Sequence, residues 1–364
     1  MKVVVGMSGG VDSAVAALLL KKKGYDVVGL FMKNWDSNIN NDKEGITDGV
    51  CPQELDYRDA KSVCDELSIP LYRVDFIKEY WDDVFKYFLD ELKKGRTPNP
   101  DIMCNKYIKF DLFKIEAKKL GADYIATGHY ARMKDGKLLR GIDSNKDQTY
   151  FLSQVSKEQL KDVLFPIGDL TKSEVRKIEE ENNITVYNKK DSTGICFIGE
   201  RHYQEFIANY LKGKKGDIVN VETNEVIGTH KGLMNYTIGQ RRNVGISGDE
   251  KRHYVCGKDS KTNTLYVAFG EDTKYLLSDE AIIEDMNYIS DRKPTKATAK
   301  FRYRSEDIPV EIEYLNDSEI KVKYKDGKSV TPGQACVIYD KDECLMGGII
   351  KKVFKDNNEL WYLK

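Results

Sequence analysis

A short stretch at the start of the chain has the composition of a phosphate-binding turn. Residues 3–7 are apolar and predict a buried strand, and residues 8–13 (SGGVDS) follow it directly, ahead of a helical pattern. Glycines let the backbone approach a ligand closely, and the N–H groups and dipole of a helix N-terminus favour an anion. No Lys or Arg lies between Val3 and Leu20, so this is not the common nucleotide loop that carries its own lysine. The alternative interpretation is a tight turn that binds nothing.

A second stretch places a carboxylate and a thiol on a stiff turn. Two prolines flank Asn99 and restrict the backbone, so Asp101 and Cys104 should be presented in a defined geometry. Because Cys104 stands just ahead of a helical pattern, a helix dipole is expected to lower its pKa. The alternative for any free cysteine is a buried small hydrophobic residue, and we assign that role to Cys64 and Cys256.

Cys196 is the second candidate thiol, within the turn-like residues 191–199. Its distance from Cys104 along the chain fits no paired zinc spacing such as C-x-x-C. Two isolated loop cysteines suit sulfur transfer, in which one carries a persulfide and the other resolves it through a disulfide. The alternative is a metal ion or iron–sulfur cluster held together with Asp101, although clusters usually take three or four thiolates.

Apolar and helical patterns alternate along the first part of the chain. They predict strands at 26–32, 71–75 and 124–126 and helices at 55–67, 78–94 and 108–120. A capping box at 171–174 predicts a further helix, to about residue 182. This alternation is typical of an α/β fold with a doubly wound parallel sheet.

The pattern changes near residue 201. A helix at 202–211 and short Gly-punctuated segments follow, and from residue 281 short strands separated by turns predict an antiparallel β-barrel. We therefore expect an α/β domain at 1–200, a small adaptor domain at 201–275 and the C-terminal barrel at 276–364.

Bulk properties limit the class of protein. The 364 residues contain no apolar run long enough for a membrane span, and the N-terminus enters a strand without a signal peptide. An odd number of cysteines, seven, favours a reducing and hence cytoplasmic compartment. The net charge of −1 excludes a protein that is basic overall, so any RNA contact must use local basic patches.

Eight motifs spread over the whole chain resemble the tRNA-specific 2-thiouridylases, which are N-type ATP pyrophosphatases. They are SGGVDS at 8–13, GLFMKNW at 29–35, GRTPNPDIMCNKYIKF at 95–110, ADYIATGHYAR at 122–132, KDQTYFL at 146–152, DSTGICFIGER at 191–201, YTIGQRRNVGI at 236–246 and TPGQACVIY at 331–339. Residues 36–54 look less typical of the family, and Cys51 receives no role.

The resemblance implies roles for individual residues. The positions that match ATP contacts are Gly6, Met7, Ser8, Gly9, Gly10, Val11, Asp12, Ser13, Met32 and Gly128. Cys196 matches the persulfide-bearing nucleophile and Cys104 its partner in a transient disulfide, with Asp101 as a proton shuttle. Asn99, Pro100 and Asp101 match the segment that holds the target base. The positions that match tRNA contacts are His129, Lys146, Asp147, Gln148, Arg302, Tyr303 and Gln334.

The implied activity is ATP-dependent 2-thiolation of the wobble uridine in tRNAs for Lys, Glu and Gln. ATP with Mg²⁺ would adenylate the uracil 2-oxygen, and a cysteine desulfurase or sulfur-relay protein would supply persulfide sulfur.

Three alternatives differ in what the sequence should carry. A 4-thiouridine-type tRNA sulfurtransferase would usually have extra N-terminal RNA-binding domains. A small-molecule adenylating ligase would need neither paired cysteines nor a barrel. A non-enzymatic RNA-binding protein would need no intact SGGVDS loop.

Overall fold

The computed structural model describes residues 1–42, 50–186, 203–246 and 252–363. The predicted parallel sheet is present, with strand order β3-β2-β1-β4-β7 and parallel pairing throughout. Its strands are β1 (Lys2–Met7), β2 (Asp26–Lys33), β3 (Leu71–Asp75), β4 (Tyr124–Ala126) and β7 (Val163–Leu164). The predicted α/β class is therefore confirmed.

Helices cover both faces of the sheet because side chains of β1 alternate between two cores. Val3, Val5 and Met7 pack with α1 (Val11–Lys22), α2 (Pro52–Glu66) and α8 (Lys172–Glu181). Val4 lies in the other core, with aromatic side chains from two long helical runs. The sheet is thus doubly wound.

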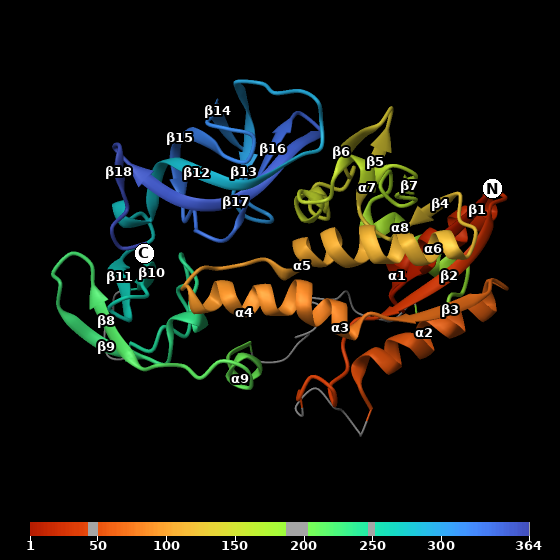
Figure 1. Ribbon diagram of the computed structural model, residues 1–364, viewed down its shortest axis with the longest axis horizontal. Helices are drawn as coiled ribbons and strands as arrows, with labels where there is room; N and C mark the ends of the chain where they lie inside the picture. Colours follow the sequence, from red (N-terminus) through yellow and green to blue (C-terminus); the bar gives the residue numbers. More distant parts are fainter. Residues whose placement is uncertain (43–49, 187–202, 247–251, 364) are drawn as a thin grey trace.

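Those two helical runs lie side by side between the sheet and the barrel (Figure 1). The first comprises α3 (Ile77–Tyr80), the π-helical η2 (Trp81–Phe85) and α4 (Lys86–Lys93). The second comprises α5 (Pro100–Met103), the π-helical η3 (Cys104–Leu112) and α6 (Phe113–Lys119). The segment between them contains Pro98, and Pro100 begins α5. Figure 1 shows this segment reaching toward the barrel and the adaptor domain.

The adaptor domain begins with α9 (Tyr203–Ala208) and contains a four-stranded sheet in the order β10-β11-β8-β9. These strands are β8 (Gly216–Asn220), β9 (Val226–His230), β10 (His253–Asp259) and β11 (Thr264–Phe269). The three predicted domain ranges stay a prediction.

The C-terminal strands close into a six-stranded antiparallel barrel, as predicted, because β12 pairs with both β15 and β17. They are β12 (Leu277–Tyr288), β13 (Lys296–Lys300), β14 (Ile308–Tyr314), β15 (Ile320–Lys328), β16 (Ala335–Asp340) and β17 (Glu343–Lys355), and β18 (Asn358–Glu359) pairs with β17.

A hairpin that the sequence did not predict joins the α/β domain to this barrel. It is formed by β5 (Ala131–Lys134) and β6 (Lys137–Arg140), and Leu139 of β6 pairs with Glu343 of β17. The first and last domains therefore share one hydrogen-bonded sheet. Within the part of the chain that the structure describes, no helix is both long enough and apolar enough to cross a bilayer.

Candidate active site

The SGGVDS turn links β1 to α1 and leaves the helix N-terminus without a side-chain cap. Gly10 is the N-cap residue, and among the described residues this helix start has no side-chain capping hydrogen bond. The Ser13 hydroxyl instead ties the turn together, accepting from the Ser8 N–H at 3.2 Å and donating to the Gly10 carbonyl at 2.9 Å. Gly9 has a φ of +71°, and a Cβ there would lie 2.2 Å from the Asp56 carbonyl. The turn can thus present backbone N–H groups to an anion.

This turn lies where the strand order changes direction. The chain passes from β1 outward to β2 and β3 and then returns to β4 on the other side of β1, which is where doubly wound sheets bind ligands. Gly128 follows β4, and a Cβ on it would lie 2.7 Å from the Asp12 carbonyl carbon. Met32 of β2 lies against Gly6. The structure therefore brings together the residues predicted to bind ATP.

Lys172 is a residue of this site that the sequence argument missed. Asp12 Oδ1 accepts hydrogen bonds from Lys172 Nζ at 2.7 Å and from the Tyr130 hydroxyl at 2.9 Å. Lys172 comes from the first turn of α8, 160 residues after Asp12, and its side chain is 14% exposed. The signal was available, because the correctly predicted capping box of Thr171 and Glu174 places Lys172 at a helix start. A cation absent from the turn itself is thus supplied from α8.

The structure corrects two expectations about Cys104. The helix begins at Pro100, with the Asn99 side chain accepting hydrogen bonds from the N–H groups of Asp101 and Ile102, so Cys104 lies inside a helical run and not on a loop ahead of one. Cys104 is 2% exposed, and burial, with a smaller contribution from the Asp101 carboxylate, raises its pKa to about 11. The expected lowering of this pKa by a helix dipole is therefore wrong.

Three further predictions concern Cys196, Cys64 and Cys256. Cys196 lies outside the described residues. Cys64 and Cys256 are fully buried, which agrees with the core role that we expected for them. Among the described residues, no group of three or more His, Cys, Asp or Glu side chains could hold a metal ion.

The segment ahead of Asn99 is held by the barrel. The Thr97 N–H donates to the Pro332 carbonyl at 3.1 Å, and Gln334 Nε2 donates to the Thr97 carbonyl at 2.6 Å. Arg96 donates to the Ile350 carbonyl at 2.9 Å. Gly333, whose φ is +91°, passes so close that a Cβ on it would lie 2.9 Å from the Thr97 nitrogen. The barrel thus fixes the residues that lead into the segment that we predicted to hold the target base.

Comparison with known proteins decides the family. Residues 1–200 match a family model described as tRNA methyl transferase HUP domain, residues 204–269 the tRNA methyl transferase PRC-barrel domain, and residues 278–350 the Aminomethyltransferase beta-barrel domain. The tRNA-specific 2-thiouridylase MnmA of Mycoplasmopsis synoviae (strain 53) is 53% identical over 366 residues, which are 99% of this chain and 98% of the relative. The tRNA-specific 2-thiouridylase MnmA of Geobacillus thermodenitrificans (strain NG80-2) is 53% identical over 370 residues, covering 100% and 98% of the two chains.

The chain belongs to the tRNA-specific 2-thiouridylase family. The resemblance noted from the sequence is therefore confirmed. The roles of individual site residues stay predictions, and the structure shows what several of them contact.

Several positions that the thiouridylase resemblance assigned to tRNA contact make hydrogen bonds within the protein. Asp147 is 5% exposed and accepts hydrogen bonds from Gly141 and Thr149, and burial raises its pKa. The Gln148 side chain accepts from the Tyr130 N–H at 2.9 Å. His129 Nδ1 lies 2.7 Å from the Thr127 hydroxyl, and burial lowers the pKa of His129 well below 6.5. In this thiouridylase the side chains of Asp147 and Gln148 therefore hold nearby backbone N–H groups, and His129 is bonded to the Thr127 side chain.

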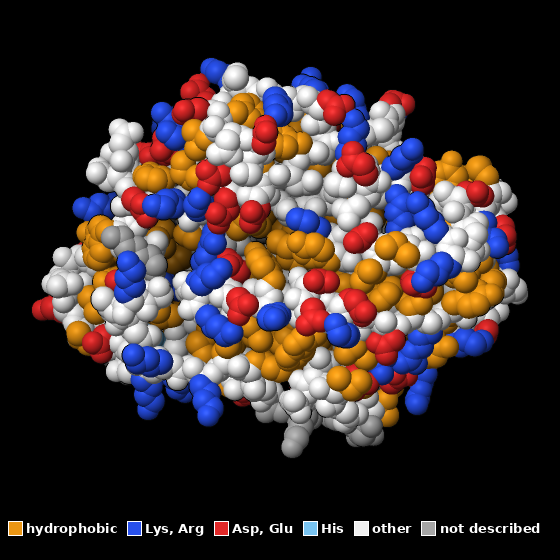
Figure 2. All heavy atoms as spheres, in the orientation of Figure 1, with side chains coloured by type: hydrophobic (Ala, Val, Ile, Leu, Met, Phe, Trp, Pro, Cys, Tyr) orange, Lys and Arg blue, Asp and Glu red, His pale blue; other side chains and the backbone are white. Residues whose placement is uncertain are grey.

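Of the three barrel positions, Gln334 bonds Thr97 as described above, and Tyr303 and Arg302 behave differently from each other. The Tyr303 ring packs against Phe151 at a centroid distance of 4.4 Å, so it lies beside the segment that follows Gln148. Arg302 is exposed on the thiouridylase surface. Figure 2 shows Lys and Arg side chains interspersed with Asp and Glu on the face in view, as the near-zero net charge predicts.

Proposed function

We propose that this enzyme 2-thiolates the wobble uridine of tRNAs for Lys, Glu and Gln at the expense of ATP. The observation that carries the proposal is the Asp12–Lys172 pair beside the uncapped N-terminus of α1, at the carboxyl ends of β1 and β4. It combines a backbone anion cradle, a cation and a carboxylate in one place. Family membership supports uracil of tRNA as the group that is activated.

On this proposal, the cradle serves the phosphates of ATP. The N–H groups of residues 9–13 and the Lys172 ammonium would bind the β- and γ-phosphates, which leave together as pyrophosphate. Asp12 and the Ser13 hydroxyl offer oxygen ligands of the kind that Mg²⁺ prefers, and Mg²⁺ would neutralise phosphate charge there. The Asp12 carboxylate would then be shared between Lys172 and that ion.

The uracil side of the reaction would begin with activation of a poor leaving group. The 2-oxygen attacks the α-phosphorus, a new O–P bond forms, and the bond to pyrophosphate breaks, so that the oxygen can later leave with AMP. The wobble base must leave its stack to reach this point. Residues 99–101 would hold the base. The barrel contacts of Thr97 support this role because they fix the backbone that leads into these residues.

Sulfur would then pass from Cys196 to carbon 2. The terminal sulfur of a Cys196 persulfide bonds to carbon 2, and AMP leaves with the former 2-oxygen. The Cys104 sulfur attacks the Cys196 sulfur, the S–S bond to the transferred sulfur breaks, and a Cys104–Cys196 disulfide remains for a dithiol reductant. In a second route Cys104 attacks first and releases hydrosulfide, which bonds to carbon 2. Asp101 takes the Cys104 proton in either route. A base is needed because a thiol whose pKa is raised to about 11 stays protonated near neutral pH.

The decisive experiment is a single turnover with tRNA, ATP and a persulfide donor. Cys196→Ser should form AMP-activated tRNA but transfer no sulfur, and Cys104→Ser should accept sulfur and then stall. Peptide mapping of the parent enzyme should show the Cys104–Cys196 disulfide after one turnover. Cys51→Ser, a buried cysteine without an assigned role, is the matched control and should react normally.

Two outcomes would contradict this mechanism. Full thiolation by Cys196→Ser would show that the reaction does not need a persulfide on Cys196. Loss of activity in both variants, without a disulfide but with bound iron and sulfide, would favour a cluster in place of sulfur relay.

A further inference from the structure

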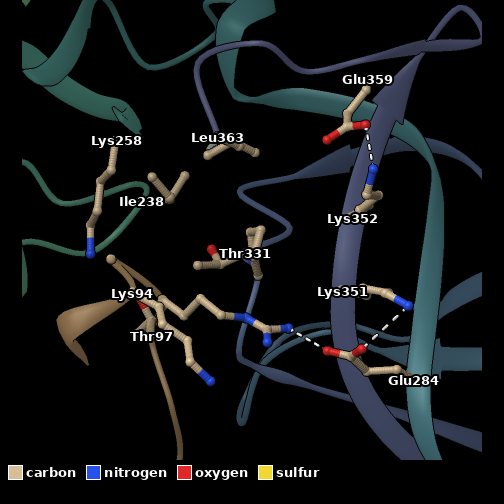
Figure 3. A pocket seen from close by; sticks show the side chains of 13 residues that line it. Lys94, Thr97, Ile238, Lys258, Glu284, Thr331, Lys351, Lys352, Glu359 and Leu363 are labelled. Carbon is tan, nitrogen blue, oxygen red and sulfur yellow. Dashed lines mark hydrogen bonds and ion pairs between the residues drawn. The ribbon is translucent and has the colours of Figure 1, made fainter. Parts of the chain in front are cut away.

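A cavity of about 320 Å³ lies where the α/β domain, the adaptor domain and the barrel meet (Figure 3). The segment between α4 and α5 forms one wall, the end of β10 a second, and β12, β17 and β18 a third. Its charged lining residues are Lys94, Arg96, Lys258, Glu284, Lys351, Lys352 and Glu359. The cavity is separate from the Asp12–Lys172 cradle, and nothing in the mechanism above uses it.

Lys258 is the unusual member of this lining. It is 4% exposed, and no described group accepts a hydrogen bond from its Nζ. Figure 3 shows the side chain reaching from β10 into the cavity, with Nζ directed toward the segment of Lys94 and Thr97. Burial lowers the pKa of Lys258 to about 7, because no counter-charge offsets the loss of water.

The other lining cations already have carboxylate partners. Lys94 pairs with Glu91 at 2.8 Å, Arg96 with Glu284 at 2.8 Å, and Lys352 with Glu359 at 2.8 Å. Lys351 also contacts Glu284, at 3.6 Å. Among the lining residues that the structure describes, Lys258 is therefore the cation left without an anion.

A second polar group in the same lining lacks a partner. Thr97 Oγ1 is buried and has no hydrogen bond to any described residue. Buried polar groups are normally satisfied, so two of them in one cavity indicate a ligand that accepts hydrogen bonds and carries negative charge. A phosphate group has both properties, and ammonium and hydroxyl donors are common phosphate partners.

We propose that this cavity binds one phosphate group, with Lys258 and Thr97 as its donors. The phosphate is a backbone phosphate of tRNA near the target uridine, because Thr97 stands two residues before Asn99. This assignment rests on the proposed function. A free phosphate anion would use the same donors. Filling the site also supplies the counter-charge that Lys258 lacks, so binding is coupled to protonation of its amine.

The groups that face Lys258 across the cavity are Lys94 and Arg96 from the α4–α5 segment, Glu284 from β12, Lys351 and Lys352 from β17, and Glu359 from β18. The other lining lysines and Arg96 are held in ion pairs, and Lys258 is the lining cation whose pKa burial lowers to about 7.

The test compares Lys258→Met with Lys261→Met, an exposed lysine in the turn after β10, in the full-length enzyme. tRNA binding is measured by filter titration at several salt concentrations and at pH 6.5 and 8, and inorganic phosphate binding by calorimetry. Lys258→Met should weaken tRNA binding about tenfold at pH 6.5 and lower the salt slope by about one. The parent should lose tRNA affinity on going to pH 8 more than Lys258→Met does, and Lys261→Met should match the parent.

The two binding measurements distinguish a tRNA phosphate from a free phosphate anion. Lost tRNA affinity assigns the site to a backbone phosphate, whereas lost phosphate binding with unchanged tRNA affinity assigns it to a free anion. Unchanged binding of both overturns the proposal. Thr97→Val provides a second variant if Lys258→Met does not fold, and it should weaken the same binding a few-fold. Because binding and 2-thiouridine formation are measured separately, failure of the parent to thiolate tRNA would contradict the proposed function and not this site.

Discussion

The nucleotide cradle and the predicted target-base segment are held in place in opposite ways. The hydrogen bonds that shape the SGGVDS turn join residues three to five positions apart, such as Ser8 and Ser13. The segment ahead of Asn99 is fixed by partners 237 and 254 positions away, Gln334 and Ile350. The backbone of the turn is therefore shaped locally by one strand and one helix, whereas the residues that lead into the base segment take their position from the last domain. On the proposed mechanism, activation of ATP and placement of the base would therefore depend on different parts of the chain.

The largest effect should come from removing the cation that α8 supplies to the cradle. Lys172→Met should lower the rate of AMP formation by about 100-fold or more, because the ammonium that faces the leaving pyrophosphate is lost. The tRNA dissociation constant should stay the same. Lys177→Met is the control, since Lys177 is on the exposed side of the same helix and pairs with Glu181. An unchanged rate of AMP formation in Lys172→Met would remove this residue from the cradle.

A second variant tests the base segment from the barrel side. Gly333→Ala should reduce kcat/KM for tRNA thiolation about tenfold, because its Cβ would push against Thr97 and misplace residues 99–101. ATP binding should not change. Gly136→Ala is the matched control, since Gly136 has a φ of +74° but open space around its Cβ position. Equal losses in the two variants would mean that backbone strain, and not the contact with Thr97, is responsible.

The same contrast explains what the sequence could predict. The parallel sheet, the SGGVDS turn, the barrel and the capping box of α8 all follow from periodicity or from neighbouring residues. Lys172, the burial of Cys104 and the barrel contacts of Thr97 depend on tertiary packing that no local pattern encodes. The β5–β6 hairpin was missed because each strand has only four residues and its pairing with β17 is non-local.

A smaller effect is expected from two basic residues of the barrel, the half-buried Lys300 and the exposed Arg302. Replacing Lys300 and Arg302 by Ala should reduce the salt dependence of tRNA binding by about one to two charges, because phosphate contacts release counterions. Lys296→Ala, on the same strand but paired with Glu311, is the control. An unchanged slope in filter-binding titrations would place these residues outside the RNA interface.

The smallest effect concerns the pH dependence of stability on the cradle side. Since burial lowers the pKa of His129 in the folded protein, the unfolded chain binds more protons as the pH falls below about 6.5. The free energy of unfolding should therefore fall with pH below that value, by up to about 1.4 kcal/mol per pH unit for this one group. Chemical denaturation of the parent and His129→Gln between pH 5 and 7.5 measures it, and parallel pH profiles would contradict the assignment.

The β5–β6 hairpin has a consequence for synthesis on the ribosome. Its pairing partner Glu343 emerges only after about 200 further residues, so β6 must wait with one edge unpaired. An exposed strand edge invites pairing with other chains, and short length and basic side chains oppose it. Four of the ten residues from Ala131 to Arg140 are basic: Arg132, Lys134, Lys137 and Arg140. The charges that later pair with the barrel, Arg132 with Asp342 and Lys137 with Glu343, would first protect the nascent chain from aggregation.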